Sequence, residues 1–167
     1  MELWDVLDEY GNKTGKTIKR GSSLSQGEYR LVVDVWIMNG NNEFLISKRT
    51  PQKHPDPDKW EPTLGSATIE DDDSISAALR EVREELGVML NSQAGILIKR
   101  FKSRNVIFDV WLFRQEVDVS TVVLQEEEVD EFMWATESKI KELIKKGEFI
   151  PKERIPYMDK LFKICRV

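Results

Sequence analysis

The chain has 167 residues, 40% of them hydrophobic, with a formal net charge of -5 at pH 7 and a pI near 5.1. This length suits one domain over residues 1–167. The acidic balance argues against general nucleic-acid binding or attachment to a membrane surface. No apolar stretch approaches the roughly 18 residues of a membrane span, and a single cysteine, Cys165, allows no internal disulfide. We therefore expect a cytoplasmic protein.

The first part of the chain predicts two hairpins and a long loop. Residues 3–21 are predicted to form a strand, a turn around Gly11 and Asn12, and a second strand, within an N-terminal extension over residues 1–29. Residues 29–49 hold two apolar runs around the turn NGNN, which predicts a hairpin with a well-buried first strand. Residues 50–66 contain four of the six prolines, so we expect an irregular loop there.

Helical and strand patterns alternate in the second part of the chain. A helix is predicted over residues 75–86, strands over 95–103 and 105–117, and an amphipathic helix over 137–147. The tail adds a last short helix. This order indicates the α/β class, with a mixed sheet covered by helices.

The first helix groups three carboxylates. At 100° per residue its apolar residues form one stripe, and Glu81, Glu84 and Glu85 occupy the adjoining arc. Ser74 is a suitable N-cap and Gly87 permits a left-handed end. One interpretation is a solvated face with an Arg80–Glu84 pair. The other is a site for a hard cation such as Mg²⁺, which takes carboxylate ligands and cancels their repulsion.

Residues 65–88 carry a recognisable signature. They resemble the Nudix box, whose second half is complete here as REVREELGV. The stretches LISKR, KWEPT and EEEVDEFMWAT also resemble landmarks of the Nudix hydrolase superfamily, and the N-terminal hairpin is similar to that of the subgroup related to type I isopentenyl-diphosphate isomerase. The resemblance implies a Nudix-type α/β/α sandwich with a mixed β-sheet.

The first half of the box departs from the family pattern. Counting from Gly65 places the box glutamate at position 71, and counting back from Arg80 places it at 72. Both positions hold aspartate, so one residue is inserted in EDDDS. The shorter side chains and the altered turn change the ligand geometry that the loop offers.

The resemblance implies a Mg²⁺-dependent pyrophosphohydrolase that cleaves a nucleoside diphosphate linked to another moiety, or a related phosphoanhydride, with Mn²⁺ as an alternative metal. By carry-over, Glu81, Glu84 and Glu85 are metal ligands and catalytic residues. Arg80 orients them, and Gly65 lets the backbone approach the metal or substrate. The general base and the identity of the small-molecule diphosphate stay unassigned.

Three positions outside the box have two interpretations each. Arg49, at a strand end, either binds substrate phosphate or is an exposed charge. Asp109, in an apolar strand, either serves the metal or substrate or points to solvent. The acidic run at 126–128 is either a solvated turn or sends one carboxylate into the site.

Two other functions remain open at this stage. A Nudix-fold module that binds a nucleotide or a protein without hydrolysis is the first, because the box is altered. Isomerase activity on isopentenyl diphosphate is the second and is disfavoured, because Gly65 and Ala67 stand where that family has its catalytic cysteine and metal-binding histidine. The N-terminal hairpin leaves a homodimer open.

Overall fold

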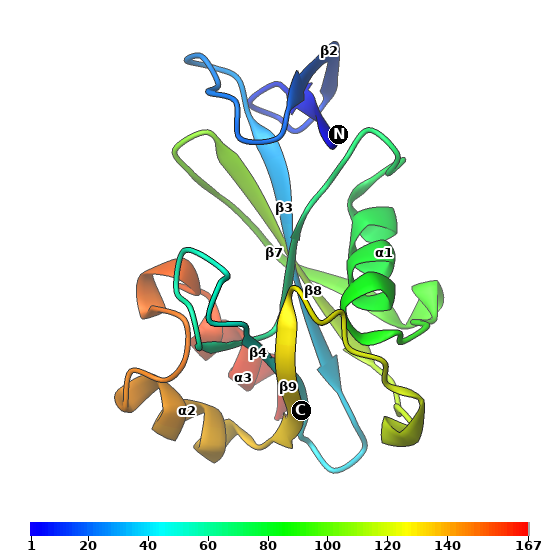
Figure 1. Cartoon of the computed structure of the whole chain (residues 1–167), viewed down its shortest axis with the longest axis vertical. Coiled ribbons are helices and arrows are strands. Elements are labelled where there is room, and N and C mark those ends of the chain that lie inside the picture. The colour runs from blue at the N-terminus through cyan, green and yellow to red at the C-terminus, as the bar shows by residue number, and fades with distance from the viewer. Residues whose placement is uncertain (167) are drawn as a thin grey trace.

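The protein, described over residues 1–166 by a computed structural model, is built around one large mixed sheet (Figure 1). Five strands follow the path β5-β4-β3-β8-β7, with β6 paired to β3 and β9 paired to β4. The strands are β3 Arg30–Met38, β4 Phe44–Arg49, β5 Trp60–Glu61, β6 Thr63–Ser66, β7 Gly95–Ser103, β8 Val106–Arg114 and β9 Val129–Ala135. The helices are α1 Ser74–Leu86, α2 Glu137–Lys145 and α3 Met158–Cys165.

The centre of the sheet is the parallel pair β3 and β8. Their register runs from Arg30 opposite Val106 to Met38 opposite Arg114, and the remaining strand pairs are antiparallel. Because β3 is covered on both faces, seven successive residues from Val32 to Met38 are buried. The predicted mixed sheet is confirmed.

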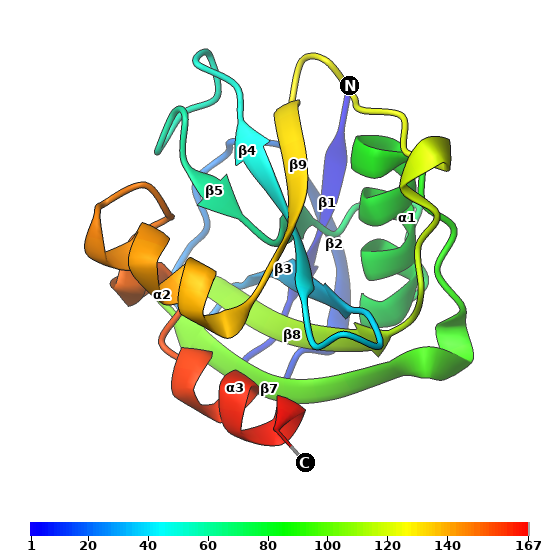
Figure 2. The same ribbon diagram turned by 90° about the horizontal axis from the view of Figure 1, so that it is seen from below.

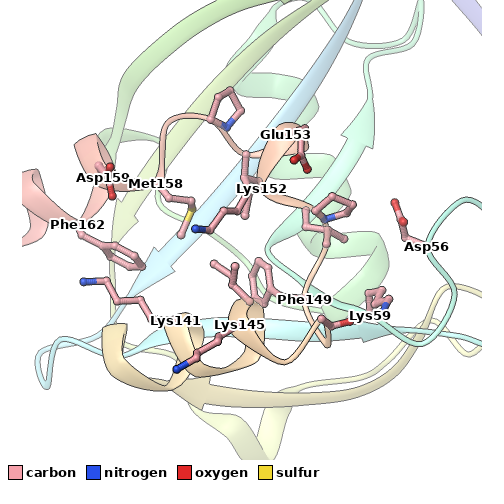
Figure 3. Close-up of a pocket in the computed structure, with 16 residues that line it drawn as sticks. Asp56, Lys59, Lys141, Lys145, Phe149, Lys152, Glu153, Met158, Asp159 and Phe162 are labelled. Carbon is pink, nitrogen blue, oxygen red and sulfur yellow. Dashed lines mark hydrogen bonds between the residues drawn. The ribbon is translucent and has the colours of Figure 1, made fainter.

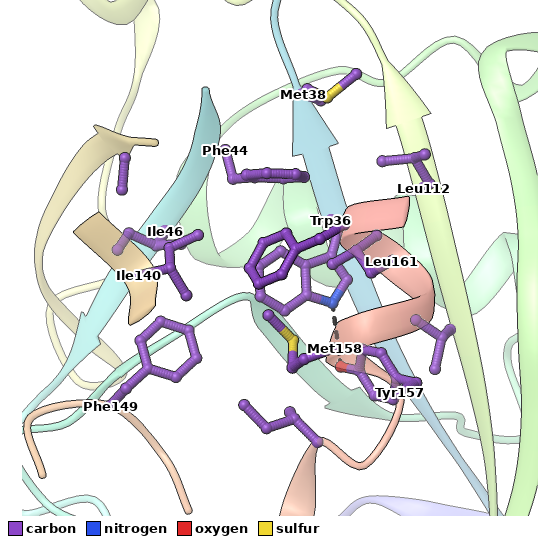
Figure 4. Close-up of a cluster of buried hydrophobic side chains, with 14 of the residues drawn as sticks. Trp36, Met38, Phe44, Ile46, Leu112, Ile140, Phe149, Tyr157, Met158 and Leu161 are labelled. Atoms are coloured by element: carbon purple, nitrogen blue, oxygen red, sulfur yellow. Dashed lines mark hydrogen bonds between the residues drawn. The ribbon is translucent and has the colours of Figure 1, made fainter. Parts of the chain in front are cut away.

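Helices cover both faces of this sheet, so the predicted α/β/α sandwich is also confirmed (Figure 2). Helix α1 packs through Ala77, Ala78 and Val82 against one face. Helices α2 and α3 cover the other face, where Trp36, Phe44 and Phe149 pack together (Figure 4). There Trp36 stacks on Phe149 with ring centroids 6.3 Å apart.

Both ends of α1 are fixed by local interactions. Asp73, one residue before the predicted cap, accepts a hydrogen bond from the Ser76 amide at 2.9 Å. Ser74 instead starts the helix, and its Oγ accepts a bond from the Trp111 indole at 2.8 Å. The prediction that Ser74 is the N-cap was therefore wrong, because the aspartate reaches the same amides. The left-handed end at Gly87 is confirmed, with φ of 67°.

The predicted N-terminal hairpin is confirmed, and it forms a two-stranded sheet of its own instead of an edge of the main sheet. It consists of β1 Leu3–Leu7 and β2 Lys13–Lys19. An isolated bridge between Leu7 and Tyr29 joins it to the main body, and the Arg30 guanidinium lies 4.4 Å from the centre of the Trp4 ring. Within residues 1–166 no helix has the length and apolar character needed to cross a membrane.

Candidate active site

Arg80 ties the acidic loop before α1 to the helix. Its Nε and Nη2 donate to the two oxygens of Asp71, both at 2.9 Å, and Nη2 also donates to the Ser66 carbonyl at 3.0 Å. Its Nη1 donates to Glu84 at 3.0 Å and lies 3.1 Å from Glu81. The Arg80–Glu84 pair predicted from the spacing is therefore present, as one part of a larger network.

The altered first half of the box has a defined structure. Asp71 is buried, and besides Arg80 it accepts a bond from the Thr68 amide at 2.9 Å. The next residue, Asp72, is exposed. Of the two aspartates that the insertion places in register with the box, Asp71 is therefore the one that organises the loop.

Glu81 lies directly against strand β6. A methyl group added at Gly65 would overlap the carboxyl carbon of Glu81. Gly65 stands opposite Val33 of the central strand, so the strand itself cannot withdraw to make room. Only glycine permits this approach between backbone and carboxylate. Burial raises the pKa of Glu81 to about 7, partly opposed by Arg80.

Glu85 is the most buried carboxylate of the helix. Its exposed fraction is 3%, its Oε1 lies 3.5 Å from the Lys53 ammonium, and its Oε2 has no hydrogen-bond partner. Burial raises its pKa to about 8, although Lys53 opposes this shift. Glu84, in contrast, has 47% of its side chain exposed. The three glutamates therefore occupy three different environments.

Two further carboxylates join Glu85 at the Lys53 ammonium. Lys53 Nζ lies 2.7 Å from Glu128 and 3.7 Å from Glu61. Sequence reasoning left Glu128 open within an acidic run and did not consider Glu61. The irregular loop predicted over residues 50–66 was wrong at its end, because residues 60–61 and 63–66 pair with neighbouring strands as β5 and β6. In the sequence, the only available signal for Glu61 was a charge between Trp60 and Pro62.

Arg49 is buried, with 7% of the residue exposed, and is not an exposed charge at a strand end. Its Nη1 donates to Glu61 at 2.8 Å, while its Nε has no partner. Arg49 therefore contacts the carboxylate group around Lys53 through Glu61. Its predicted contact with substrate phosphate stays a prediction.

Asp109, in strand β8, belongs to a different ion pair. It is buried and accepts two hydrogen bonds from Arg100, at 2.6 and 2.8 Å, so it does not point to solvent. Trp111, two residues along the strand, bonds to Ser74 at the start of α1, whereas Glu85 lies in the last turn. Arg100 thus occupies both oxygens of Asp109, whose role toward metal or substrate stays a prediction.

Among residues 1–166, no three side chains of the metal-binding types are already arranged to hold a metal ion. The carboxylates face Arg80 and Lys53 instead. The donor set nevertheless fits a hard divalent cation, since it consists of carboxylate oxygens and includes the unpartnered buried Oε2 of Glu85.

A groove of about 920 Å³ lies between α2, residues 147–156 and α3 (Figure 3). Its lining includes four lysines and an apolar floor, namely Lys59, Lys141, Lys145, Lys152, Phe149 and Phe162. None of Glu81, Glu84 and Glu85 lines it. It is therefore distinct from the carboxylate site.

Comparison with known proteins assigns the family. The NUDIX domain model matches residues 28–158, and an uncharacterized Nudix hydrolase of Listeria monocytogenes is 36% identical over 90% of this chain and 89% of its own length. The chain belongs to the Nudix family, and the match begins after most of the N-terminal hairpin extension.

Two other similarities are consistent with this assignment. An isopentenyl-diphosphate Delta-isomerase of Photorhabdus laumondii is 28% identical over 59% of this chain and 56% of its own length. The crystal structure of a Deinococcus radiodurans protein, DR0079, superposes with a TM-score of 0.74 at 18% identity, covering 95% of this chain and 98% of that one. The latter shows the shared fold.

Proposed function

We propose that this Nudix hydrolase is a Mg²⁺-dependent pyrophosphohydrolase that cleaves a nucleoside diphosphate linked to another group, or a related phosphoanhydride. The observation that carries the proposal is Glu85, a buried carboxylate with an unpartnered oxygen, on the helix that also presses Glu81 against Gly65. A buried polar atom without a hydrogen-bond partner is costly unless a ligand supplies the missing contact. The family assignment adds the enzyme class.

Each residue of the site has a role that its contacts support. The metal would be held by Glu81, Glu84 and Glu85. Glu128 would join them, because it contacts the same Lys53 ammonium as Glu85. Arg80 positions Glu81 and Glu84 while binding the Asp71 loop. Mn²⁺ has the same preference for oxygen ligands and is an alternative cofactor.

A bound divalent ion would neutralise the diphosphate and lower the pKa of an attacking water. The chain's own contribution is to hold carboxylates beside the backbone of Gly65, where no side chain intervenes. In the metal-free protein, burial raises the pKa of Glu81 to about 7 and that of Glu85 to about 8. Asp109 is not included in the proposed metal site, since Arg100 satisfies it.

The test compares wild type with Glu85→Gln on a panel of nucleoside triphosphates, sugar nucleotides, dinucleotides and isopentenyl diphosphate, with Mg²⁺ or EDTA. We expect metal-dependent release of phosphorylated products, and a loss of turnover of roughly 1,000-fold in the variant. Thermal unfolding checks that the variant is folded.

Asp130→Asn is the matched control, because Asp130 is exposed. It should hydrolyse the same substrate at the wild-type rate. Equal turnover by Glu85→Gln would contradict the role of that residue. Binding without cleavage across the whole panel would favour the non-catalytic binding module. Cytoplasmic location and a homodimer remain predictions.

A further inference from the structure

The loop between β4 and β5 sends a positive charge into the carboxylate site. Lys53 is 17% exposed along its side chain, and its ammonium lies 2.7, 3.5 and 3.7 Å from Glu128, Glu85 and Glu61. These carboxylates come from three separate segments: the turn before β9, helix α1 and strand β5. A cation at this position therefore links three parts of the fold.

Two observations indicate that the ammonium does not complete this position. Glu85 keeps one buried oxygen without a partner, although Lys53 is beside its other oxygen. An ammonium has three donors, and only the Glu128 contact is at a normal hydrogen-bond distance. The longer distances to Glu61 and Glu85 leave room for a better-matched cation.

Resting on the metal dependence proposed above, we propose that Glu61, Glu85 and Glu128 form a cation position that Lys53 holds in the metal-free protein and yields to a divalent metal ion. Metal binding then releases Lys53 and the loop that carries it. A divalent ion bound by these carboxylates would repel the Lys53 ammonium, because like charges a few ångström apart repel strongly in a buried site. The released ammonium is free to meet the negative charge of a diphosphate.

Hydrogen bonds within the loop between β4 and β5 connect Lys53 to the turn before β9, so displacement of Lys53 would affect both segments. Thr50 bonds through its amide and its hydroxyl to the carbonyls of Glu128 and Glu127, at 3.4 and 3.2 Å. The Lys53 amide in turn donates to the Thr50 carbonyl at 3.1 Å. Withdrawal of Lys53 from Glu128 would therefore loosen the contact between this loop and the turn before β9.

The first experiment measures Mn²⁺ binding by electron paramagnetic resonance, with no substrate present. Lys53→Met should bind Mn²⁺ about tenfold more tightly than wild type, because a competing occupant and a like charge are both removed. Lys53→Arg keeps the charge and should bind close to wild type. Lys59→Met is the control for net charge, since Lys59 lies in the same loop but lines the groove of Figure 3.

The second measurement needs no substitution at Lys53. Hydrogen exchange of the Lys53 amide in wild type should become at least about fivefold faster on adding Mn²⁺, because its loop is released. Glu85→Gln, with the same Mn²⁺ addition, should show little change. This readout holds even where the Lys53 variants fold poorly.

The outcomes separate this inference from the proposed function. Mn²⁺ binding that depends on Glu85 but is equal in Lys53→Met and wild type would overturn the exchange and leave the metal site intact. An equal gain in Lys59→Met, or unchanged loop exchange, would also overturn it. Absence of Mn²⁺ binding in every form would overturn both proposals.

Discussion

Two buried carboxylates on opposite faces of the sheet differ in how completely their oxygens are hydrogen-bonded. Asp34, in β3, is fully buried and accepts two hydrogen bonds from Arg154, at 2.9 and 2.6 Å, and one from Tyr157 at 2.7 Å. Glu85, on α1, is 3% exposed but has one oxygen without a partner. Asp34, which stabilises the fold, therefore has all its hydrogen-bond partners within the protein. Glu85, which we propose binds a ligand, lacks one.

The surroundings of each carboxylate agree with this contrast. Tyr157 accepts a hydrogen bond from Trp36, and the Arg154 guanidinium lies 4.4 Å from the centre of the Phe108 ring. Asp34 is therefore locked into the aromatic core. Glu85 faces a lysine on a long irregular loop.

The largest effect is expected on the free energy of unfolding, when the hydrogen-bond network around Asp34 is disrupted. Asp34→Asn removes a fully buried charge and leaves the half-buried Arg154 without its partner, so we expect a loss of about 3–5 kcal/mol in unfolding free energy. Urea denaturation measures it, with Asp130→Asn as the exposed control. A loss below about 1 kcal/mol, the usual worth of an exposed pair, would show that Asp34 is not structural.

The next effect is expected at the incomplete site. Glu81→Gln should lower turnover by roughly a hundredfold or more, because a charge-bearing ligand is lost. Its unfolding free energy should match or exceed that of wild type, since a buried carboxylate is replaced by a neutral group. Steady-state rates and urea denaturation together check this. Strong destabilisation with normal turnover would reverse the contrast with Asp34.

A smaller effect should follow from Gly65→Ala. The added methyl group would push the Glu81 carboxylate away from β6, and we expect turnover to fall by about tenfold. In a double-mutant cycle with Glu81→Gln, the alanine should cost little more, because the group that it displaces has already been disabled. Fully additive losses would mean that Gly65 acts independently of Glu81.

The smallest effect concerns pH. The pKa of Glu85 is about 8 in the folded protein, against 4.5 for an ordinary glutamate, so between these values the folded state retains a proton that the unfolded state has lost. Stability of the metal-free protein should therefore fall as pH rises through this window. Melting temperatures in EDTA should show a shallower decline in Glu85→Gln. Identical pH slopes would refute the shifted pKa.

Sequence patterns predicted local features well. Helix α1, its left-handed end at Gly87, the N-terminal hairpin and the strands on both sides of NGNN all depend on short-range periodicity and turn chemistry. The error at Ser74 arose because two adjacent residues, Asp73 and Ser74, were both capable caps. Local rules rank such residues poorly.

The sequence by itself determined the fold class, the acidic face of α1 and the family. Each of these depends on residue spacings within individual segments and on the order of those segments along the chain. The tertiary structure alone decided which charges meet. It paired Asp109 with Arg100, buried Arg49 against Glu61, and joined Glu61, Glu85 and Glu128 around Lys53. A period of 2.0 or 3.6 residues assigns a side chain to a face, but its partner depends on segments that lie far apart in the chain.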